Sequence, residues 1–190
     1  MKRRSLLLAA PVGALASLAG CAGPSIEEMA QELPRLDLRQ YFNGPLTAHG
    51  IFTDRSGQVK RRFIVRLVGR WQADVGVLEE DFEYSDGVRE RRVWTIRYLG
   101  GGRYSGSAGD VVGQASGEAA GNALRWRYSL KLPVGGSVYE VDFDDWMFLV
   151  DDRVMLNKAR MSKFGVHLGD VTLSLSRLAR LLADRAAREG

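Results

Sequence analysis

The sequence predicts an all-β domain in which an antiparallel meander of about eight to ten short strands closes into a barrel. Between Leu46 and Arg177, apolar and polar residues alternate in short segments that Gly, Asp and Asn residues interrupt, and helical periodicity is almost absent. Closure removes exposed sheet edges, so a barrel is the most economical arrangement of so many consecutive strands. The pattern does not set the strand order, which leaves a two-sheet sandwich open.

Polar turns, such as 54–57 and 85–87, separate the strands. In the second strand Phe63 and Val65 share one face while Arg62 lies on the other, so one side faces a core and the other faces water. The segments that we expect to be strands are 46–53, 59–71, 77–84, 88–99, 103–110, 111–118, 123–132, 138–150, 153–161 and 167–176.

Two segments depart from this pattern. The stretch 103–118 is rich in Gly, Ala and Ser, which indicates close approach of neighbouring backbones. Residues 178–190 place Leu178, Leu181 and Leu182 at helical spacing among arginines. We therefore expect a short C-terminal helix, which could cap the domain or lie on a membrane surface.

The N-terminal residues resemble a bacterial lipoprotein signal. A basic start is followed by an apolar run that is too short to span a bilayer and then by the residues Leu18-Ala19-Gly20-Cys21. The resemblance implies cleavage before Cys21, a diacylglyceryl group on its thiol and an acyl chain such as palmitate on its amino group. Ala22 implies sorting to the outer membrane, with the domain facing the periplasm. Arg3-Arg4 leaves twin-arginine export open beside the general route.

These features divide the 190-residue chain into a signal peptide at 1–20, a lipid-anchored tether at 21–40, the β-barrel domain at 41–177 and the helical tail at 178–190. Removing the signal leaves 170 residues, which suits one domain with a substantial core. It also lowers the formal net charge from +4 to +1, so nucleic acid is not an expected partner. Cys21 is the only cysteine, so we expect no disulfide.

The expected strands alternate in charge. Strand 77–84 carries acidic residues on its polar face, whereas the strands on either side are rich in arginine. Pairing of opposite charges across an antiparallel meander explains this pattern without a ligand. An anion-binding patch would need arginines that point inward, and strict alternation makes Arg92 the candidate because it shares a face with Trp94.

No catalytic or metal-binding motif emerges, so we expect no enzyme, no metal and no cofactor. The acidic cluster at 142–145 splits between two strand faces, and Asp151 and Asp152 do not complete a calcium-binding loop. His49 and His167 are isolated in sequence, although the first and last strands of a barrel can be neighbours. An enzyme acting on lipid would require inward groups at a pocket mouth, with His49, Asp144, Asp145 and His167 as candidates.

Aromatic residues are the best candidates for ligand contacts. The four tryptophans fall on four different expected strands, with tyrosines on related faces. A barrel of about eight strands is just wide enough either to fill itself with side chains or to hold one small ligand. If the interior is hollow, the ligand-binding candidates are Trp71, Trp94, Trp126, Trp146, Tyr98, Tyr128 and Arg92.

Several sequence blocks resemble the DUF3833 family of uncharacterised proteobacterial lipoproteins over about residues 38 to 176. The blocks are Asp54-Arg55-Ser56-Gly57, Phe82 to Gly87, Asp110 to Gly113, Gly121 to Trp126, Asp144 to Met147 and Lys163-Phe164-Gly165. The resemblance implies a lipocalin-like, or calycin, barrel and a lipid-related role in the cell envelope. The family has no established activity, so it implies no catalytic residue.

Two functions follow as expectations. The first is a membrane-anchored periplasmic lipoprotein that binds or presents an apolar ligand such as a fatty acyl chain or lipid. The alternative is a non-catalytic structural or interaction lipoprotein whose solid barrel meets a protein partner in the envelope. A hollow interior favours the first function and a filled interior favours the second.

Overall fold

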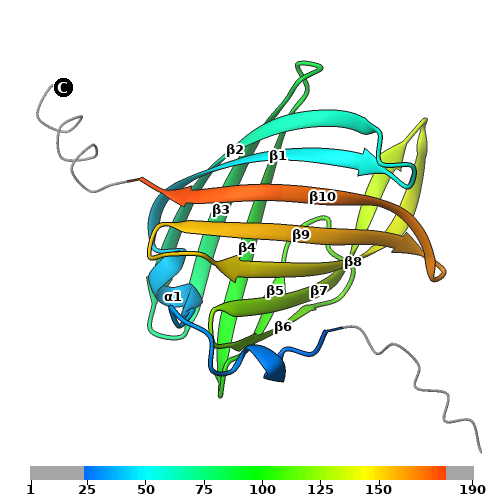
Figure 1. Ribbon diagram of the computed structural model, residues 1–190. Coiled ribbons are helices and arrows are strands. Elements are labelled where there is room, and N and C mark those ends of the chain that lie inside the picture. Colours follow the sequence, from blue (N-terminus) through cyan, green and yellow to red (C-terminus); the bar gives the residue numbers. More distant parts are fainter. Residues whose placement is uncertain (1–23, 179–190) are drawn as a thin grey trace, which may run out of the picture.

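The computed structural model describes residues 24–178, which form a closed antiparallel barrel of ten strands (Figure 1). Each strand pairs with its neighbours in sequence, and β10 pairs with β1 to close the ring. The strands are β1 (Gly44–Asp54), β2 (Val59–Gln72), β3 (Val75–Tyr84), β4 (Arg89–Gly100), β5 (Arg103–Ser107), β6 (Ala115–Ala120), β7 (Ala123–Val134), β8 (Ser137–Leu149), β9 (Val154–Lys163) and β10 (Val166–Arg177).

The expected meander barrel is therefore confirmed, and the two-sheet sandwich is excluded by the register that joins β1 to β10, from Leu46 opposite Arg177 to Asp54 opposite Gly169. The segment expected to be a signal peptide, the expected lipidation site Cys21 and the expected helix beyond residue 178 lie outside the described residues. The strands expected at 103–110 and 111–118 are shorter and shifted, since residues 108–114 connect β5 to β6.

Alternation along the strands sorts side chains between the interior and water. On the outer surface, Arg91 on β4 lies 2.8 Å from Glu79 and 2.9 Å from Asp81 on β3, and Arg70 on β2 lies 2.8 Å from Glu79. These exposed pairs confirm that most strand arginines serve cross-strand pairing. Exposed ion pairs of this kind each contribute little stability, about 0 to 1 kcal/mol.

The small residues of β5 and β6 make room for a tryptophan ring. A Cβ atom at Gly106 or Gly117 would collide with the indole of Trp126, which projects from β7 over both strands. Trp126 is 5% exposed. The close approach expected in this stretch is thus the contact between the indole ring of Trp126 and the backbone of Gly106 and Gly117.

Residues before β1 close one end of the barrel. The short helix α1 (Leu38–Tyr41) begins at Asp37, whose side chain accepts a hydrogen bond from the Arg39 backbone N–H, and it lies across the end where β1 begins (Figure 1). The Tyr41 hydroxyl donates to the Leu175 carbonyl at 3.1 Å. Leu38, near the end of the expected tether, and Phe42, just after it, are buried, so this segment packs on the barrel as its floor.

A single 3₁₀ turn, Glu27–Met29, precedes this floor. It lies close to the β6–β7 turn, where a Cβ atom at Gly121 would collide with the Met29 carbonyl oxygen. Within residues 24–178, neither this turn nor α1 is long or apolar enough to cross a bilayer.

Candidate functional site

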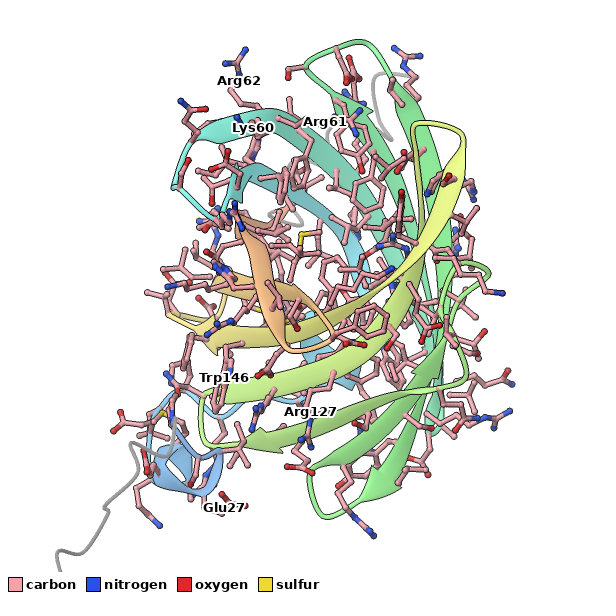
Figure 2. The ribbon with its side chains drawn as sticks, turned by 90° about the vertical axis from the view of Figure 1, so that its right-hand side faces the viewer. Glu27, Lys60, Arg61, Arg62, Arg127 and Trp146 are labelled. Carbon is pink, nitrogen blue, oxygen red and sulfur yellow. The ribbon has the colours of Figure 1, made fainter. Side chains whose placement is uncertain are left out.

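The interior of the barrel is hollow. A cavity of about 980 Å³ extends from the floor made by Leu38 and Phe42 to the opposite end, where Arg61 lies at the mouth (Figure 2). Most of its wall is apolar, from residues that strand alternation turns inward, such as Val65 on β2. This volume is at the upper end of the range of about 300 to 1,000 Å³ typical of small-molecule sites.

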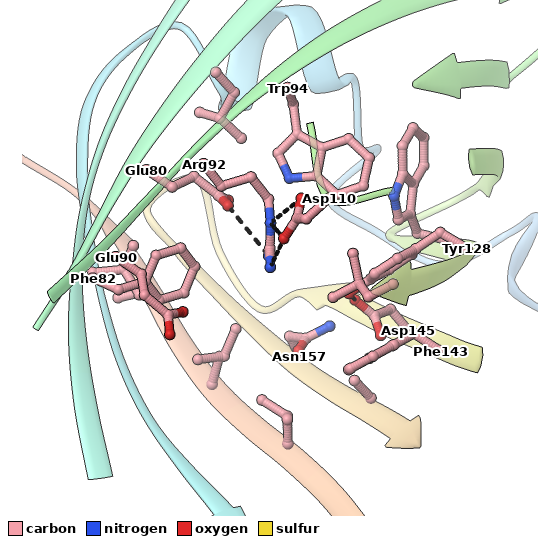
Figure 3. A pocket seen from close by; sticks show the side chains of 18 of the residues that line it. Glu80, Phe82, Glu90, Arg92, Trp94, Asp110, Tyr128, Phe143, Asp145 and Asn157 are labelled. Atoms are coloured by element: carbon pink, nitrogen blue, oxygen red, sulfur yellow. Dashed lines mark hydrogen bonds and ion pairs between the residues drawn. The ribbon is translucent and has the colours of Figure 1, made fainter. Parts of the chain in front are cut away.

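Three of the expected aromatic contacts line the cavity. Trp94 from β4 meets Trp126 and Tyr128 from β7 edge to face, with ring centroids 5.7 Å and 5.4 Å apart. Tyr128 in turn stacks on Phe143 of β8 at 5.0 Å. These rings form one continuous aromatic wall (Figure 3).

The other three aromatic candidates do not line the cavity. Trp71 covers Gly76 at the closed end, and Tyr98 is 5.1 Å from Tyr104, also at that end. Trp146 lies on the outer surface, because it is adjacent in sequence to the inward Asp145 and successive strand residues face opposite sides (Figure 2). Contact between these three residues and a ligand inside the barrel therefore has no support from the geometry of the cavity.

Arg92, the seventh candidate, points into the cavity and is held by two carboxylates (Figure 3). Its Nε lies 2.9 Å and its Nη2 2.7 Å from Asp110 Oδ2, and its Nη1 lies 3.8 Å from Glu80 Oε2. Burial disfavours the charge on Arg92, but the Asp110 hydrogen bonds and the charge of Glu80 outweigh this effect and raise the pKa of Arg92. Burial also raises the pKa of Glu80 to about 7, with Arg92 opposing the shift.

In the described part of the chain, the Arg92–Asp110 pair lies where the barrel wall has no ladder of backbone hydrogen bonds on one side of β4. β5 pairs with β4 from Thr95 to Gly100, so among the described residues the half of β4 from Arg89 to Trp94 has no strand partner on that side. The connection 108–114 lies there and is attached to β7, where the Lys131 N–H donates to the Asp110 carbonyl at 2.9 Å. The ion pair thus links this half of β4 to β7 through the connection.

A second polar group lies deeper, on β8 and β9. The Tyr128 hydroxyl donates to Asp145 Oδ2 at 3.2 Å, and Asn157 Nδ2 donates to the Trp146 carbonyl at 3.4 Å. Burial raises the pKa of Asp145 to about 7; the hydrogen bond from Tyr128 opposes the shift, and the charges of Asp144 and Glu80 add to it. Asp145 and Asn157 are buried, and both line the cavity.

Sequence reasoning did not select Glu80, Asp110 or Asn157 as cavity residues. The signal for two of them was present, since Glu80 has the inward parity of Leu78 and Asn157 has that of Met155. Asp110 lies in a connection, where no periodicity indicates its direction. A charged or amide side chain at an inward strand position indicates a polar group in the cavity wall.

The remaining chemical candidates do not converge. His49 is opposite Ser174 on β10, whereas His167 is near the other end of that strand and lies 3.1 Å from Asp170. Asp144 lies on the outer face, where it binds Arg125 at 2.7 Å. Within residues 24–178, no three His, Cys, Asp or Glu side chains are placed to hold a metal ion. Of the four lipid-enzyme candidates, Asp145 is the one that lines the cavity.

The family model for DUF3833, described as a protein of unknown function, matches residues 15–177. No curated protein matches the chain significantly. In structure, the chain is similar to a protein of unknown function from the DUF3598 family of Nostoc punctiforme, with 13% identity and a TM-score of 0.53 over 77% of this chain and 51% of that one. The chain thus spans about half the length of that protein.

It is also similar to the S-type phycobiliprotein lyase of Guillardia theta, with 7% identity and a TM-score of 0.55 over 82% of this chain and 99% of that one. At these identities the likeness concerns the fold. The expected lipocalin-like barrel is confirmed.

Proposed function

This chain belongs to the DUF3833 family of proteins of unknown function, and we propose that its barrel binds an apolar or amphiphilic small molecule, such as a lipid with a fatty acyl chain. The observation that carries the proposal is the cavity of about 980 Å³ with a largely apolar wall. The alternative role as a scaffold depended on a solid barrel, and the interior is not solid.

Several features support a site for one elongated guest. The floor at Leu38 and Phe42 closes one end, the mouth is at the other, and the aromatic wall lies between them. Burial of apolar surface supplies most of the binding free energy at such sites, and a few polar groups orient the ligand. Arg92, Asp145 and Asn157 are suited to that orienting role because they are fixed by hydrogen bonds or ion pairs.

The proposal includes attachment to the outer membrane through Cys21, with the barrel in the periplasm. This part depends on the signal-like sequence that ends at Cys21 and on Ala22 after it. A lipid-anchored carrier would receive its guest from, or deliver it to, the bilayer beside it. Cys21→Ser should remove the diacylglyceryl mass from the chain and shift the protein out of the membrane fraction; retention of both would refute the anchor.

The cavity is tested with the full chain purified from its host membrane and transferred to a non-ionic amphipol. Organic extraction followed by mass spectrometry should recover a lipid in molar amounts near that of the protein, and the emptied chain should take up Nile red. The variant Ala159→Phe should abolish both, because Ala159 is buried in β9 and lines the cavity.

Thermal melting shows whether the variant is folded, and Ala159→Leu replaces it if the larger ring prevents folding. A matched control is Asn43→Phe, an exposed residue just before β1. Wild-type chain that yields no lipid and takes up no dye would overturn the proposal. A folded Ala159→Phe variant that binds as well as wild type would overturn the cavity as the site.

A further inference from the structure

Two acceptor atoms in the cavity wall have no hydrogen-bond partner among the described residues. They are Asp145 Oδ1 and Asn157 Oδ1, in side chains that belong to residues 7% and 2% exposed. A buried acceptor without a partner loses its hydration and gains nothing in return, so native proteins rarely retain one without a reason. Here both atoms belong to residues that line one cavity.

The two residues are held so that these oxygens remain available. The Tyr128 hydroxyl donates its hydrogen bond to Asp145 Oδ2 and leaves Oδ1 unpaired within residues 24–178. The amide nitrogen of Asn157 donates to the Trp146 carbonyl, which leaves Asn157 Oδ1 unpaired in the same part of the chain. Asp145 is opposite Ala159 and Asn157 is opposite Met147, so the two are diagonal neighbours on the inner face of β8 and β9. Figure 3 shows both side chains projecting into the same space.

Their depth in the barrel determines which part of a guest they would meet. β9 begins at Val154 beside the closed end, so Asn157 lies three residues from that end and close to the floor. The mouth is at the opposite end of β8 and β9, where the β7–β8 and β9–β10 turns lie (Figure 1). A long guest would therefore place its inner end, and not its middle, against these acceptors.

The charge distribution argues against a carboxylate at this depth. Among the described residues, the basic residues that contribute to the cavity lining are Arg61, Arg91, Arg92 and Lys131. The Arg91 guanidinium is paired with Glu79 and Asp81 on the outer surface. Arg92 is already engaged by Asp110 and Glu80, and Arg61 binds Asp86 at the mouth. A carboxylate at the inner end would thus meet acceptors and further carboxyl groups instead of a free cation.

We infer that the cavity takes an amphiphile whose inner end carries a hydrogen-bond donor, a hydroxyl or an amine, and that Asp145 and Asn157 accept from this donor. The inference rests on the proposed function and names the ligand class of the same site. A fatty acid, by contrast, would keep its carboxylate at the mouth and leave both acceptors unpaired.

Displacement of Nile red from the full chain in non-ionic amphipol compares three probes of equal chain length: hexadecanol, hexadecylamine and hexadecanoate. For the wild type, the alcohol and the amine should bind about tenfold more tightly than hexadecanoate, the effect expected of a satisfied pair of buried acceptors. Asp145→Leu and Asn157→Leu should each remove most of this preference and leave hexadecanoate binding unchanged. Asp142→Asn, which changes an exposed, outward carboxylate of the same strand, is the matched control.

Asp145→Asn provides the second measurement, made at pH 8 where the Asp145 carboxyl is ionised, because it retains an acceptor oxygen and removes the negative charge. Weaker binding of hexadecylamine alone identifies an amine donor, whereas unchanged binding of both probes identifies a neutral hydroxyl donor. Three probes that bind equally, with no effect of the leucine variants, would overturn the inference and leave the proposed function standing. Failure of every probe to displace the dye would instead refute the proposed function.

Discussion

Arg92 on β4 donates three hydrogen bonds to Asp110, at 2.7 to 3.1 Å, across the part of the barrel wall where β4 has no strand partner among the described residues. The bidentate geometry is the strong form of this interaction. The side chain of Arg92 is 18% exposed and that of Asp110 is 36% exposed, so water screens the pair only in part. This pair joins two segments that no backbone ladder joins.

Asp110→Asn should loosen this part of the wall. Loss of the charged acceptor leaves the Arg92 guanidinium with Glu80 alone, at a cost of about 1 to 3 kcal/mol in the free energy of unfolding. Hydrogen–deuterium exchange should rise in residues 89–94 and 108–114. Asp142→Asn, which alters an exposed carboxylate bound to Ser129, should leave both segments unchanged; equal exchange in the two variants would contradict the role of the pair.

Gly117→Ala should destabilise the fold, because the new methyl group would overlap the indole of Trp126. Overpacking of this kind costs about 1 to 3 kcal/mol. The comparison is Gly109→Ala, at a glycine with negative φ whose Cβ position is open. Urea unfolding monitored by tryptophan fluorescence measures both, and a Gly117→Ala midpoint equal to that of wild type would show that the ring can move aside.

Leu38→Ala should open the floor of the cavity. Leu38 is 1% exposed and holds α1 against the barrel, so its truncation should cost about 2 to 5 kcal/mol in the free energy of unfolding. Gln40→Ala, at an exposed position of the same helix, should cost less than about 1 kcal/mol. Denaturant unfolding decides the matter, and similar losses in both variants would mean that α1 is not a packed floor.

Stability should fall as the pH rises from 5 to 8. Burial raises the pKa values of Glu80 and Asp145 to about 7, whereas in the unfolded chain carboxyls ionise near pH 4, so across this range the folded state binds more protons. Their stabilising protonation is complete below about pH 4 and is lost as the pH passes 7. Carboxyls with lowered pKa values, such as Asp37, titrate below this window.

Thermal melts should therefore give a lower Tm at pH 8 than at pH 5. Replacement of both groups, as Glu80→Gln with Asp145→Asn, should flatten the profile between these two values. A wild-type Tm that is constant or rises over the interval would show that the two carboxyls remain ionised in the folded chain.

Phe164→Asn should keep or raise stability. Phe164 has a φ of 51° and is followed by Gly165 at 77°, the two positive values of a type I′ hairpin turn, for which Asn-Gly is strongly preferred. The Phe164 ring is 91% exposed, so its removal loses little packing. We expect a gain of about 1 kcal/mol by thermal melting, because Asn adopts the left-handed conformation more readily than Phe; a clear loss would show that the backbone at this position is not strained by Phe164.

The sequence alone determined which face of each strand points inward, because side chains alternate with a period of two wherever a strand forms. This rule is enough to place Arg92, Trp94, Trp126 and Tyr128 inside the barrel. It also places Glu80 and Asn157 there, so the sequence by itself is sufficient to predict both as cavity residues. The resemblance to lipoprotein signals likewise depends on sequence alone.

Only the tertiary structure decided that the barrel is closed and hollow, because closure depends on the register between β1 and β10, which are more than a hundred residues apart in sequence. The same applies to the floor, since nothing in residues 38–42 by themselves specifies the surface on which they pack. The Arg92–Asp110 pair depends on where a strandless connection returns to β7. The local pattern of residues determines the direction in which each strand side chain points. The distance between segments that are far apart in sequence depends on how the whole sheet curves and closes.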